Sequence, residues 1–231
     1  LAADYNQIEL RVLAHISGDE KLLTAFREGE DIHRRTAAEF FGVEPNAVSP
    51  TQRRQAKAVN FGIVYGISDY GLSRDLAISR KQADEYIKLY FARYPKVAEY
   101  QKKTIEQGRL NGYVSTMFGR RRPLDDLNNR NFNLRSFAER MAVNTPIQGT
   151  AADIIKIAMV NIYRDLLPRF PECRLLLQVH DELIFEVPKA CLKEFAALVK
   201  QYMEQAVSLD LPLIADLQSG DDWYNMEKLK V

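Results

Sequence analysis

The sequence has little cysteine and no long apolar run. Two cysteines, Cys173 and Cys191, in 231 residues argue against a fold held together by disulfides, and we expect both thiols to be small and inert. No apolar run approaches the roughly 20 residues that a membrane-spanning helix needs, so we expect no membrane partner. The chain also lacks an initiator methionine and a signal peptide, because it starts at Leu1, and we expect a fragment of a longer protein.

The charge of the chain is small overall but unevenly distributed. The formal net charge is +1, and apolar residues make up 46% of the chain, which is ample for a buried core. Residues 49–140 nevertheless hold 18 basic and 9 acidic side chains, so this segment carries +9 and the remainder −8. Solvated helix faces account for part of this charge. The pattern favours a protein that binds phosphate with one region and metal ions with another.

Helix signals dominate the middle of the chain. Ser49, Pro50 and Gln52 provide an N-cap, a proline at the first helical position and a capping box, and Gly66 supplies the end of that helix. A second capping box starts at Ser79. Signals of this kind predict helices over 31–41, 50–65, 79–94 and 95–108, and over 131–167 with a bend or break at Pro146 and Gly149.

Strand signals lie mainly towards the two ends of the chain. Residues 174–187 form two β-rich apolar runs around a short polar turn, which predicts a tight hairpin with Asp181 at its tip. A short strand or hairpin is expected over 113–122, a helix over 189–207 and a strand over 211–217. The fold class that follows is α+β, with an antiparallel sheet and a large helical insertion.

Two carboxylates, Asp4 and Asp181, are each expected at the end of a strand. Carboxylates placed in this way can hold divalent ions about 3.5 to 4 Å apart, which activate an attacking oxygen and stabilise a leaving one in phosphoryl transfer. Either residue alone is a weak signal, because acidic residues are common in solvated turns.

Cations and aromatic rings share one face of the predicted helix 50–65. Arg53, Lys57 and Phe61 are spaced four residues apart, and Tyr65 follows at the same interval. The two cations can contact phosphate oxygens, while Phe61 offers a flat apolar surface to a sugar and a base. A basic face above an ordinary core stripe is the alternative. The second cation next to Arg53 and the glycines at 62 and 66, which let another chain or a nucleobase approach closely, favour the first interpretation.

Taken together, these segments resemble the palm and fingers of family A DNA polymerases of bacteria, over almost the whole chain. Residues 4–11 resemble motif A of that family, residues 53–66 motif B, and residues 178–182 motif C. Residues 145–153 resemble a further family segment near the primer terminus.

The resemblance implies a role for each matching residue. Asp4 and Asp181, with the backbone of Tyr5, would bind two Mg²⁺ or Mn²⁺ ions, and Glu182 would be an accessory catalytic carboxylate. The residues implied to act on the incoming dNTP are Arg53 and Lys57 at the triphosphate, with Lys57 also catalytic, Phe61 on the sugar and base, Tyr65 at the template position, Glu9 against a ribose 2′-OH, and His33 near the triphosphate.

Four polar residues are implied to contact the primer or template, mainly in the minor groove: Arg140, Asn144, Gln148 and His180. Without the resemblance, ordinary structural roles are the better interpretation for several of these residues. Glu9 could support a helix start, His33 could be a surface histidine, and Asn144 with Gln148 could cap a helix break.

The resemblance also implies a division into domains and a set of partners. Residues 1–12 and 131–231 would be palm, and residues 13–130 fingers. Thumb and exonuclease domains are absent from this chain, so we expect no proofreading by it. The expected partners are primer-template DNA and dNTPs. The expected state is a monomer in the bacterial cytoplasm, associated with the nucleoid.

The chain departs from the family pattern at several places. Asn6 stands where motif A usually has serine, which should alter hydrogen bonding near the nucleotide but leave the metals unaffected. Residues 123–126 differ from the usual loop after the arginine run, so the contacts that the family makes with that loop are not carried over to this chain. Phe61 is not the tyrosine found in some members, which implies discrimination against nucleotides lacking a 3′-OH.

The predicted function is template-directed addition of deoxynucleotides to a primer 3′ end, by two-metal phosphoryl transfer with release of pyrophosphate, in replication and repair. Two alternatives stay open on the residues alone. A two-metal nuclease would use the carboxylates without needing the helix of cations and rings. A non-catalytic nucleic-acid-binding remnant would bind primer-template with a steep salt dependence and never extend it.

Overall fold

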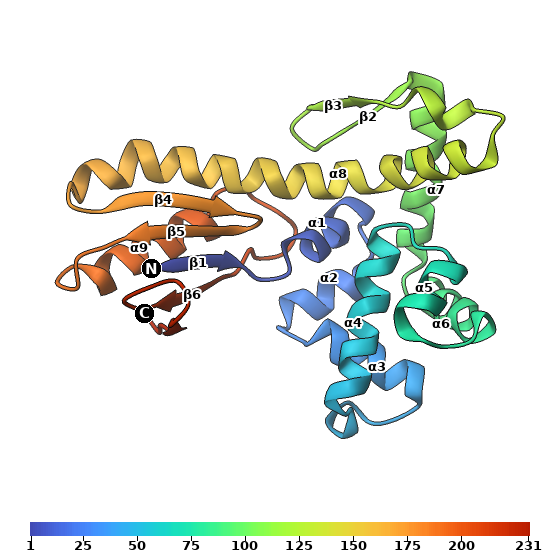
Figure 1. The fold of residues 1–231 in the computed structure, drawn as a ribbon, viewed down its shortest axis with the longest axis horizontal. Coiled ribbons are helices and arrows are strands. Elements are labelled where there is room, and N and C mark those ends of the chain that lie inside the picture. The colour runs from blue at the N-terminus through green and yellow to red at the C-terminus, as the bar shows by residue number, and fades with distance from the viewer. The chain divides into compact units, whose positions relative to one another are not determined.

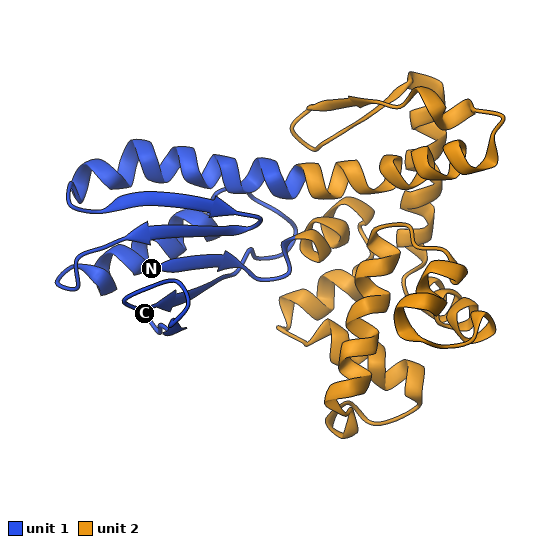
Figure 2. Cartoon of the chain, viewed as in Figure 1, with its two compact units in different colours: residues 1–8, 150–231 blue, residues 9–149 orange.

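The computed structural model describes residues 1–231, which form two compact units (Figure 2). Unit 1 consists of residues 1–8 and 150–231, and unit 2 of residues 9–149. The long helix α8 (Phe132–Asn161) contributes to both units. The domain boundaries expected at residues 12 and 130 rest on the family resemblance and not on how compactly the chain folds, so they stay a prediction.

Unit 1 is built on an antiparallel sheet with the strand order β4-β5-β1-β6-β7 (Figure 1). The first strand of the chain lies at its centre, between two strands from the end of the chain. The strands are β1 (Ala2–Tyr5), β4 (Arg174–Val179), β5 (Glu182–Glu186), β6 (Ala215–Ser219) and β7 (Glu227–Lys228). This sheet, with the helices of both units, confirms the expected α+β class.

One face of the sheet packs on helix α9 (Leu192–Glu204). Side chains alternate between the two faces of a strand, so Ala3 and Tyr5 of β1 share a face that Asp4 does not. The Tyr5 hydroxyl donates to the carbonyl of Met203 in α9 at 2.6 Å. Ala3 and Tyr5 are buried, whereas Asp4 is exposed. Packing on α9 therefore directs Asp4 to the opposite face.

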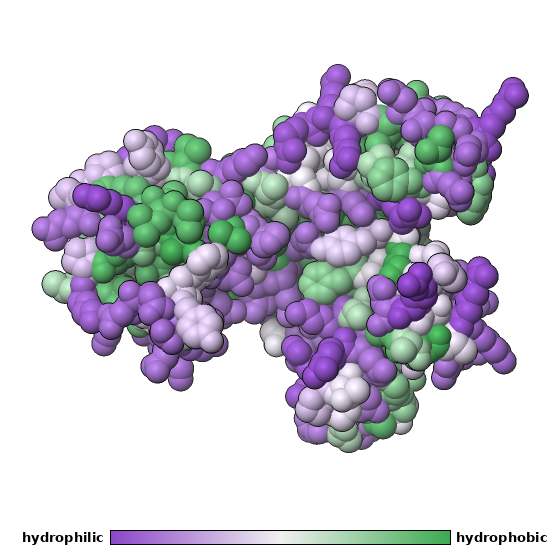
Figure 3. All heavy atoms as spheres, viewed as in Figure 1, coloured by the Kyte–Doolittle hydropathy of each residue, from purple (hydrophilic) through white to green (hydrophobic).

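Strand β4 lies at the edge of this sheet and carries exposed apolar side chains. Leu176 is 52% exposed and Leu177 49% exposed, beside an irregularity in the pairing of β4 with β5. Figure 3 shows apolar side chains gathered on the visible face of unit 1. Unit 1 ends its share of α8 in a π-helical turn (Ile162–Leu166) and a 3₁₀ turn (Leu167–Arg169).

Unit 2 is mainly helical. A short two-stranded ribbon, β2 (Tyr113–Ser115) and β3 (Arg121–Pro123), is its only sheet. A short strand or hairpin was expected there, and the structure has the hairpin. Its helices are α1 (Ile8–Ser17, whose first residue belongs to unit 1), α2 (Glu20–Arg27), α3 (Ile32–Phe41), α4 (Pro50–Val64), α5 (Asp69–Leu76), α6 (Arg80–Arg93) and α7 (Pro95–Asn111), with the 3₁₀ turns Pro45–Ala47 and Asp125–Asn128 and residues 132–149 of α8.

Helix α4 begins and ends where the sequence predicts. Ser49 accepts from the backbone N–H of Gln52, whose side chain accepts from the backbone N–H of Ser49, so both bonds of the capping box are present. Gly66 follows the helix with φ 67°, a left-handed conformation that favours glycine. Ala56, Val59 and Ile63 are buried, which fixes the opposite side of the helix towards solvent.

The prediction at Pro146 and Gly149 was a bend or a break, and the break is wrong, because α8 runs unbroken through both residues. Proline removes one backbone donor at a cost of about 3 kcal/mol. Val143 and Ile147 are buried on either side of Pro146, and this packing holds the helix together. Gly149 permits close packing instead, because an added Cβ would lie 2.5 Å from the Thr116 side chain.

Other element boundaries differ from the sequence prediction by a few residues. Helix α7 continues past Gly108 to Asn111, and Gly112 at φ 75° ends it. Gly108 serves close packing against Leu127 instead. The helix expected over 189–207 is shorter, and the strand expected over 211–217 is shifted to 215–219. No helix of the chain is long and apolar enough to cross a membrane.

Candidate active site

Three carboxylates lie in a row across the middle of the sheet in unit 1. Asp4 of β1 pairs directly with Glu182 of β5 on one side and with Asp216 of β6 on the other. Residues directly opposite each other in an antiparallel pair point to the same face, with Cβ atoms about 4.5 to 5.5 Å apart. Like charges in this arrangement repel, so the row is unfavourable for folding unless a cation or protons offset it.

The electrostatic cost is concentrated on Asp4. Partial burial first, and then the charges of Asp181, Glu182 and Asp216, raise the pKa of Asp4 to about 6. A bound cation would remove that repulsion and favour the ionised carboxylate.

Asp181 occupies the turn of the β4–β5 hairpin, as the sequence predicts. His180 precedes it with φ 53°, the left-handed conformation that a two-residue turn demands. The Asp181 carbonyl accepts from the backbone N–H of Tyr5 at 3.2 Å, which ties the turn to the end of β1. His180 is exposed beside it. The start of the segment that resembles motif A is thus joined to the segment that resembles motif C by a main-chain hydrogen bond within unit 1.

Asp216 is a member of this row that sequence reasoning missed. The side-chain amide of Asn6 donates to Asp216 at 2.8 Å, and the Lys228 ammonium lies 3.8 Å from the same carboxylate. Asn6, at which motif A departs from the family pattern, is therefore a partner of the third carboxylate. The only sign of its role in the sequence was that this acidic residue lies within the strand predicted over 211–217.

These carboxylates do not form a complete metal cage. No group of three or more histidine, cysteine, aspartate or glutamate side chains in the chain is arranged to hold an ion. The donors in the row are all oxygen atoms, the ligands that Mg²⁺ prefers, and Mg²⁺ is usually bound by one or two carboxylates together with water and substrate phosphates. The donor set therefore fits such an ion.

In unit 2, the solvent-facing side of α4 begins with Arg53, which is already oriented by a carboxylate. Its Nε donates to Asp31 at 2.7 Å, and Asp31 is also the N-cap of α3. Partial burial opposes ionisation of Asp31, but hydrogen bonds from Arg53 and from the Arg34 backbone hold its pKa below the usual value. The bond uses Nε and leaves the two terminal nitrogens of Arg53 for a forked contact with phosphate.

Lys57 and Phe61 form the middle of this face. Lys57 is exposed and its ammonium lies 5.8 Å from the centre of the Phe61 ring, within the range of a cation–π contact. The rings of His33 and Tyr65 flank Phe61, with centres 5.8 and 6.2 Å away. The sequence-predicted cations and rings therefore lie together in unit 2.

His33 is buried, not a surface histidine. Its side chain is 2% exposed, and its Nδ1 lies 2.9 Å from the side-chain amide nitrogen of Asn60. The Thr36 hydroxyl donates to the Asn60 amide oxygen, so Asn60 presents its N–H₂ to the ring. Nδ1 is then the acceptor and Nε2 carries the proton of a neutral imidazole. Burial first, and then the charge of Arg53, lower the pKa of His33 to about 4.

Tyr65 and Glu9 are hydrogen-bonded to each other in unit 2. The Tyr65 hydroxyl donates to the Glu9 carboxylate at 2.5 Å. Glu9 lies in the first turn of α1, and Tyr65 caps the end of α4. The bond holds the Glu9 carboxylate at the C-terminal end of α4, where Tyr65 lies.

The three predicted DNA contacts on α8 share one face of that helix. Arg140, Asn144 and Gln148 are four residues apart, and the Arg140 side chain packs against Gly66 at the end of α4. The side-chain oxygen of Asn144 is buried and has no hydrogen-bond partner. Gln148 is exposed. An unpaired buried acceptor of this kind is costly in isolation and suits a site that binds a ligand.

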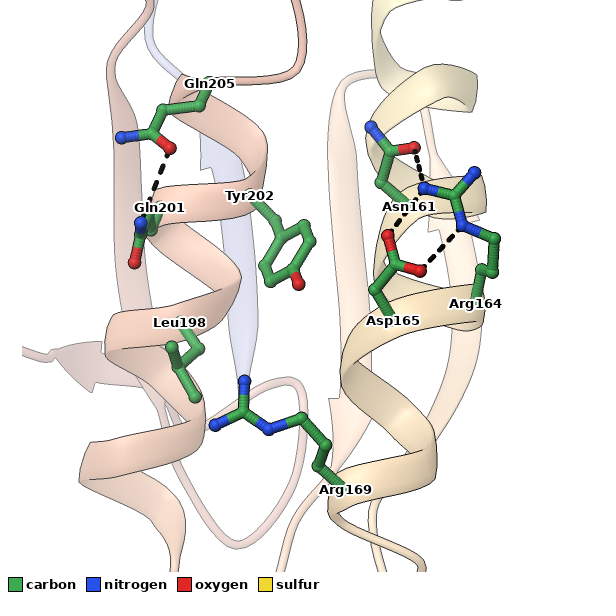
Figure 4. A pocket seen from close by; sticks show the side chains of 8 residues that line it. All are labelled: Asn161, Arg164, Asp165, Arg169, Leu198, Gln201, Tyr202 and Gln205. Carbon is green, nitrogen blue, oxygen red and sulfur yellow. Dashed lines mark hydrogen bonds and ion pairs between the residues drawn. The ribbon is translucent and has the colours of Figure 1, made fainter.

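A separate pocket of about 370 Å³ opens between α9 and the end of α8 in unit 1 (Figure 4). Arg164 is held there by Asp165, while the Arg169 side chain extends towards α9. None of the residues predicted from the sequence lines this pocket, so it is not the candidate site.

Comparison with known proteins gives one consistent result. The model of DNA polymerase family A matches residues 1–225. DNA polymerase I of Streptococcus pneumoniae serotype 4 is 56% identical over 225 residues, which is 97% of this chain and 26% of that protein. DNA polymerase I of Bacillus caldotenax is 56% identical over 224 residues, with the same two coverages. The chain thus spans about a quarter of the length of these relatives.

A solved structure shows the same likeness. The POL domain of Pol1 from M. smegmatis, in complex with DNA primer-template and dNTP, superposes with a TM-score of 0.88 and 45% sequence identity. The match covers 93% of this chain and 38% of that one.

Proposed function

The chain belongs to DNA polymerase family A, and from that premise we propose that it is the palm and fingers portion of an enzyme that extends a primer on a DNA template. Deoxynucleotides are added to the primer 3′ end and pyrophosphate is released. The observation that supports this most strongly is the row formed by Glu182, Asp4 and Asp216 across three adjacent strands. The partners are primer-template DNA and dNTPs, in the bacterial cytoplasm and at the nucleoid, and the protein acts as a monomer.

Asp4 and Asp181, with the Tyr5 backbone, are the proposed ligands of two Mg²⁺ ions, which Mn²⁺ could replace. When bound, such ions lower the pKa of the attacking hydroxyl and stabilise charge on the leaving oxygen. Glu182 and Asp216 lie beside Asp4, and both add negative charge that attracts cations to it. Asn6 and Lys228 hold the Asp216 carboxylate in place, so we assign Asp216 the role of keeping a negative charge beside Asp4.

The solvent-facing side of α4, which carries Arg53, Lys57 and Phe61, supplies the contacts to the nucleotide. Arg53, held through Nε by Asp31, directs its terminal nitrogens to the triphosphate, and Lys57 neutralises the charge that develops on the departing phosphates. Phe61 stacks on the sugar and base. His33, kept neutral by its environment, can donate from Nε2 towards the triphosphate.

Tyr65 and Glu9 act together in this proposal. Glu9 occupies the position that a ribose 2′-OH would need, and the Tyr65 hydroxyl keeps the Glu9 carboxylate there. Arg140, Asn144, Gln148 and His180 contact the primer-template, and the unpaired oxygen of Asn144 accepts from a base edge or its water.

The experiment is primer extension with the full-length protein, comparing the wild type with Lys57→Ala. A charge-assisted contact is worth roughly 1.5 to 3 kcal/mol, so kcat/KM for dNTP should fall by roughly 10- to 150-fold while the Kd for primer-template stays unchanged. Lys81→Ala is the matched control, because Lys81 is an exposed lysine of the same unit on α6.

Each alternative function gives a different result in that assay. A nuclease would shorten the primer or template in the presence of dNTPs. A non-catalytic nucleic-acid-binding remnant would bind the primer-template duplex with an affinity that falls steeply with salt concentration, and it would not extend the primer. Either outcome in the wild type would contradict the proposal.

A further inference from the structure

Two cysteines expected to be inert lie in contact at the base of the motif C hairpin. The sulfur atoms of Cys173 and Cys191 are 3.7 Å apart, and both thiols are free. Cys173 directly precedes β4, and Cys191 directly precedes α9. The whole β4–β5 hairpin, with Asp181 in its turn, lies in the chain between them.

The backbone around both thiols is held by hydrogen bonds. The N–H of Cys173 donates to the Phe170 carbonyl at 2.9 Å, and the Cys191 carbonyl accepts from Phe195 at 2.9 Å. The rings of Phe170 and Phe195 are themselves packed, with centres 5.3 Å apart. The contact between the sulfur atoms is therefore set by packed elements on both sides.

We propose that Cys173 and Cys191 form a dithiol site that is oxidised reversibly to a disulfide by low-molecular-weight disulfides. A disulfide has an S–S length of about 2.05 Å, so the sulfur atoms have to approach by about 1.7 Å for the bond to form. A metal site is the other common use of paired cysteines, but the additional ligands that zinc needs are missing here.

The two thiols have different parts in the exchange. Cys191 is half-buried and reachable from solvent, whereas Cys173 is 5% exposed. Burial, with the hydrogen bond to Cys191, raises the pKa of the Cys173 thiol well above its usual value. Cys191 is therefore the thiol that meets the oxidant, and Cys173 is the resolving thiol.

The reaction balances as thiol–disulfide exchange. The Cys191 thiolate attacks one sulfur of R–S–S–R, its S–S bond breaks and one R–S⁻ leaves. Cys173 loses its proton, attacks the Cys191 sulfur in the mixed disulfide and releases the second R–S⁻. Two cysteine thiols are oxidised by two electrons, and one R–S–S–R is reduced to two R–SH.

The disulfide would tie the base of the hairpin to the start of α9. It closes a loop of about 18 residues, for which the chain-entropy argument predicts a rise in melting temperature of roughly 5 to 10 °C. The turn with Asp181 lies at the far end of β4, six residues or roughly 20 Å away. Nucleotide incorporation should therefore stay within about twofold.

The test equilibrates the full-length protein with mixtures of reduced and oxidised glutathione, followed by thiol labelling and peptide mass spectrometry. In the wild type, both thiols should disappear together and one peptide pair should lose two hydrogen atoms. Cys173→Ser should stop at a glutathione adduct on Cys191. Cys191→Ser should leave Cys173 unmodified, because it is buried.

Three results would overturn the proposal. The first is retention of both labelled thiols in the wild type under the most oxidising mixture. The second is a stable glutathione adduct on wild-type Cys191 without the internal disulfide, or a disulfide between two molecules. The third is an oxidised protein whose melting temperature equals that of the reduced protein, measured against the Cys173→Ser, Cys191→Ser double variant. All three readouts are independent of polymerase activity.

Discussion

His33 should make the stability of unit 2 depend on pH. Burial first, then the charges of Arg53 and Lys57, lower its pKa to about 4 from a usual value near 6.5. The unfolded chain therefore binds a proton between these two values while the folded chain does not. The stabilising contribution of neutral His33 is complete above pH 6.5 and is lost as the pH falls towards 4.

The size of this effect follows from the shift. A change of about 2.5 pKa units corresponds to roughly 3 kcal/mol in total, of which about 2 kcal/mol is lost between pH 7 and pH 5. Asp4 acts in the opposite direction, because its pKa is raised to about 6 and its contribution is lost as the pH rises through that value. A comparison of variants is therefore needed to isolate His33.

The assay is urea unfolding of the full-length protein at pH 7 and pH 5, followed by the far-ultraviolet signal of the helices. His33→Asn keeps an acceptor for the Asn60 amide but cannot titrate in this range. This variant should lose about 2 kcal/mol less than the wild type between the two pH values. His180→Asn, at an exposed histidine, is the control and should behave like the wild type. Equal losses in the wild type and in His33→Asn would refute the reasoning.

Two further predictions concern the carboxylates. Asp216→Asn should raise the Mg²⁺ concentration needed for half-maximal incorporation, because it removes one negative charge beside Asp4. The control Asp221→Asn, at an exposed aspartate, should not. An equal response of both variants would exclude this electrostatic role of Asp216. Glu9→Ala should raise the ratio of rNTP to dNTP incorporation efficiency, and Tyr65→Phe should raise it less, because only the bond that holds Glu9 is lost. An unchanged ratio in Glu9→Ala would leave Glu9 with a structural role alone.

Features fixed by neighbours in sequence could be predicted. The start of α4 rests on Ser49, Pro50 and Gln52 within four residues, and the hairpin around Asp181 rests on one apolar run, one turn and another run. The face that carries Arg53, Lys57 and Phe61 follows from helical spacing alone. Helices α1, α2 and α5 are not among the predicted elements, although Asp19 and Ser68 cap the starts of α2 and α5.

Features fixed by distant segments could not be predicted. Pro146 does not break α8 because buried neighbours stabilise the helix, and this packing is not visible in a local pattern. Asp216 pairs with Asp4 across more than 200 residues, and the register between such strands is not encoded nearby. The burial of His33 against Asn60 is a contact of the same kind.

The account is tested most directly by Asp4→Asn and Asp181→Asn in the full-length protein, with single-nucleotide incorporation and primer-template binding measured on the same preparations. Both variants should lose incorporation by roughly 100-fold or more, because these carboxylates act on the charge of the transition state. Duplex affinity should be retained, since it comes from cations along the phosphates. Near-normal incorporation by either variant would contradict the assignment of Asp4 and Asp181 as the catalytic carboxylates.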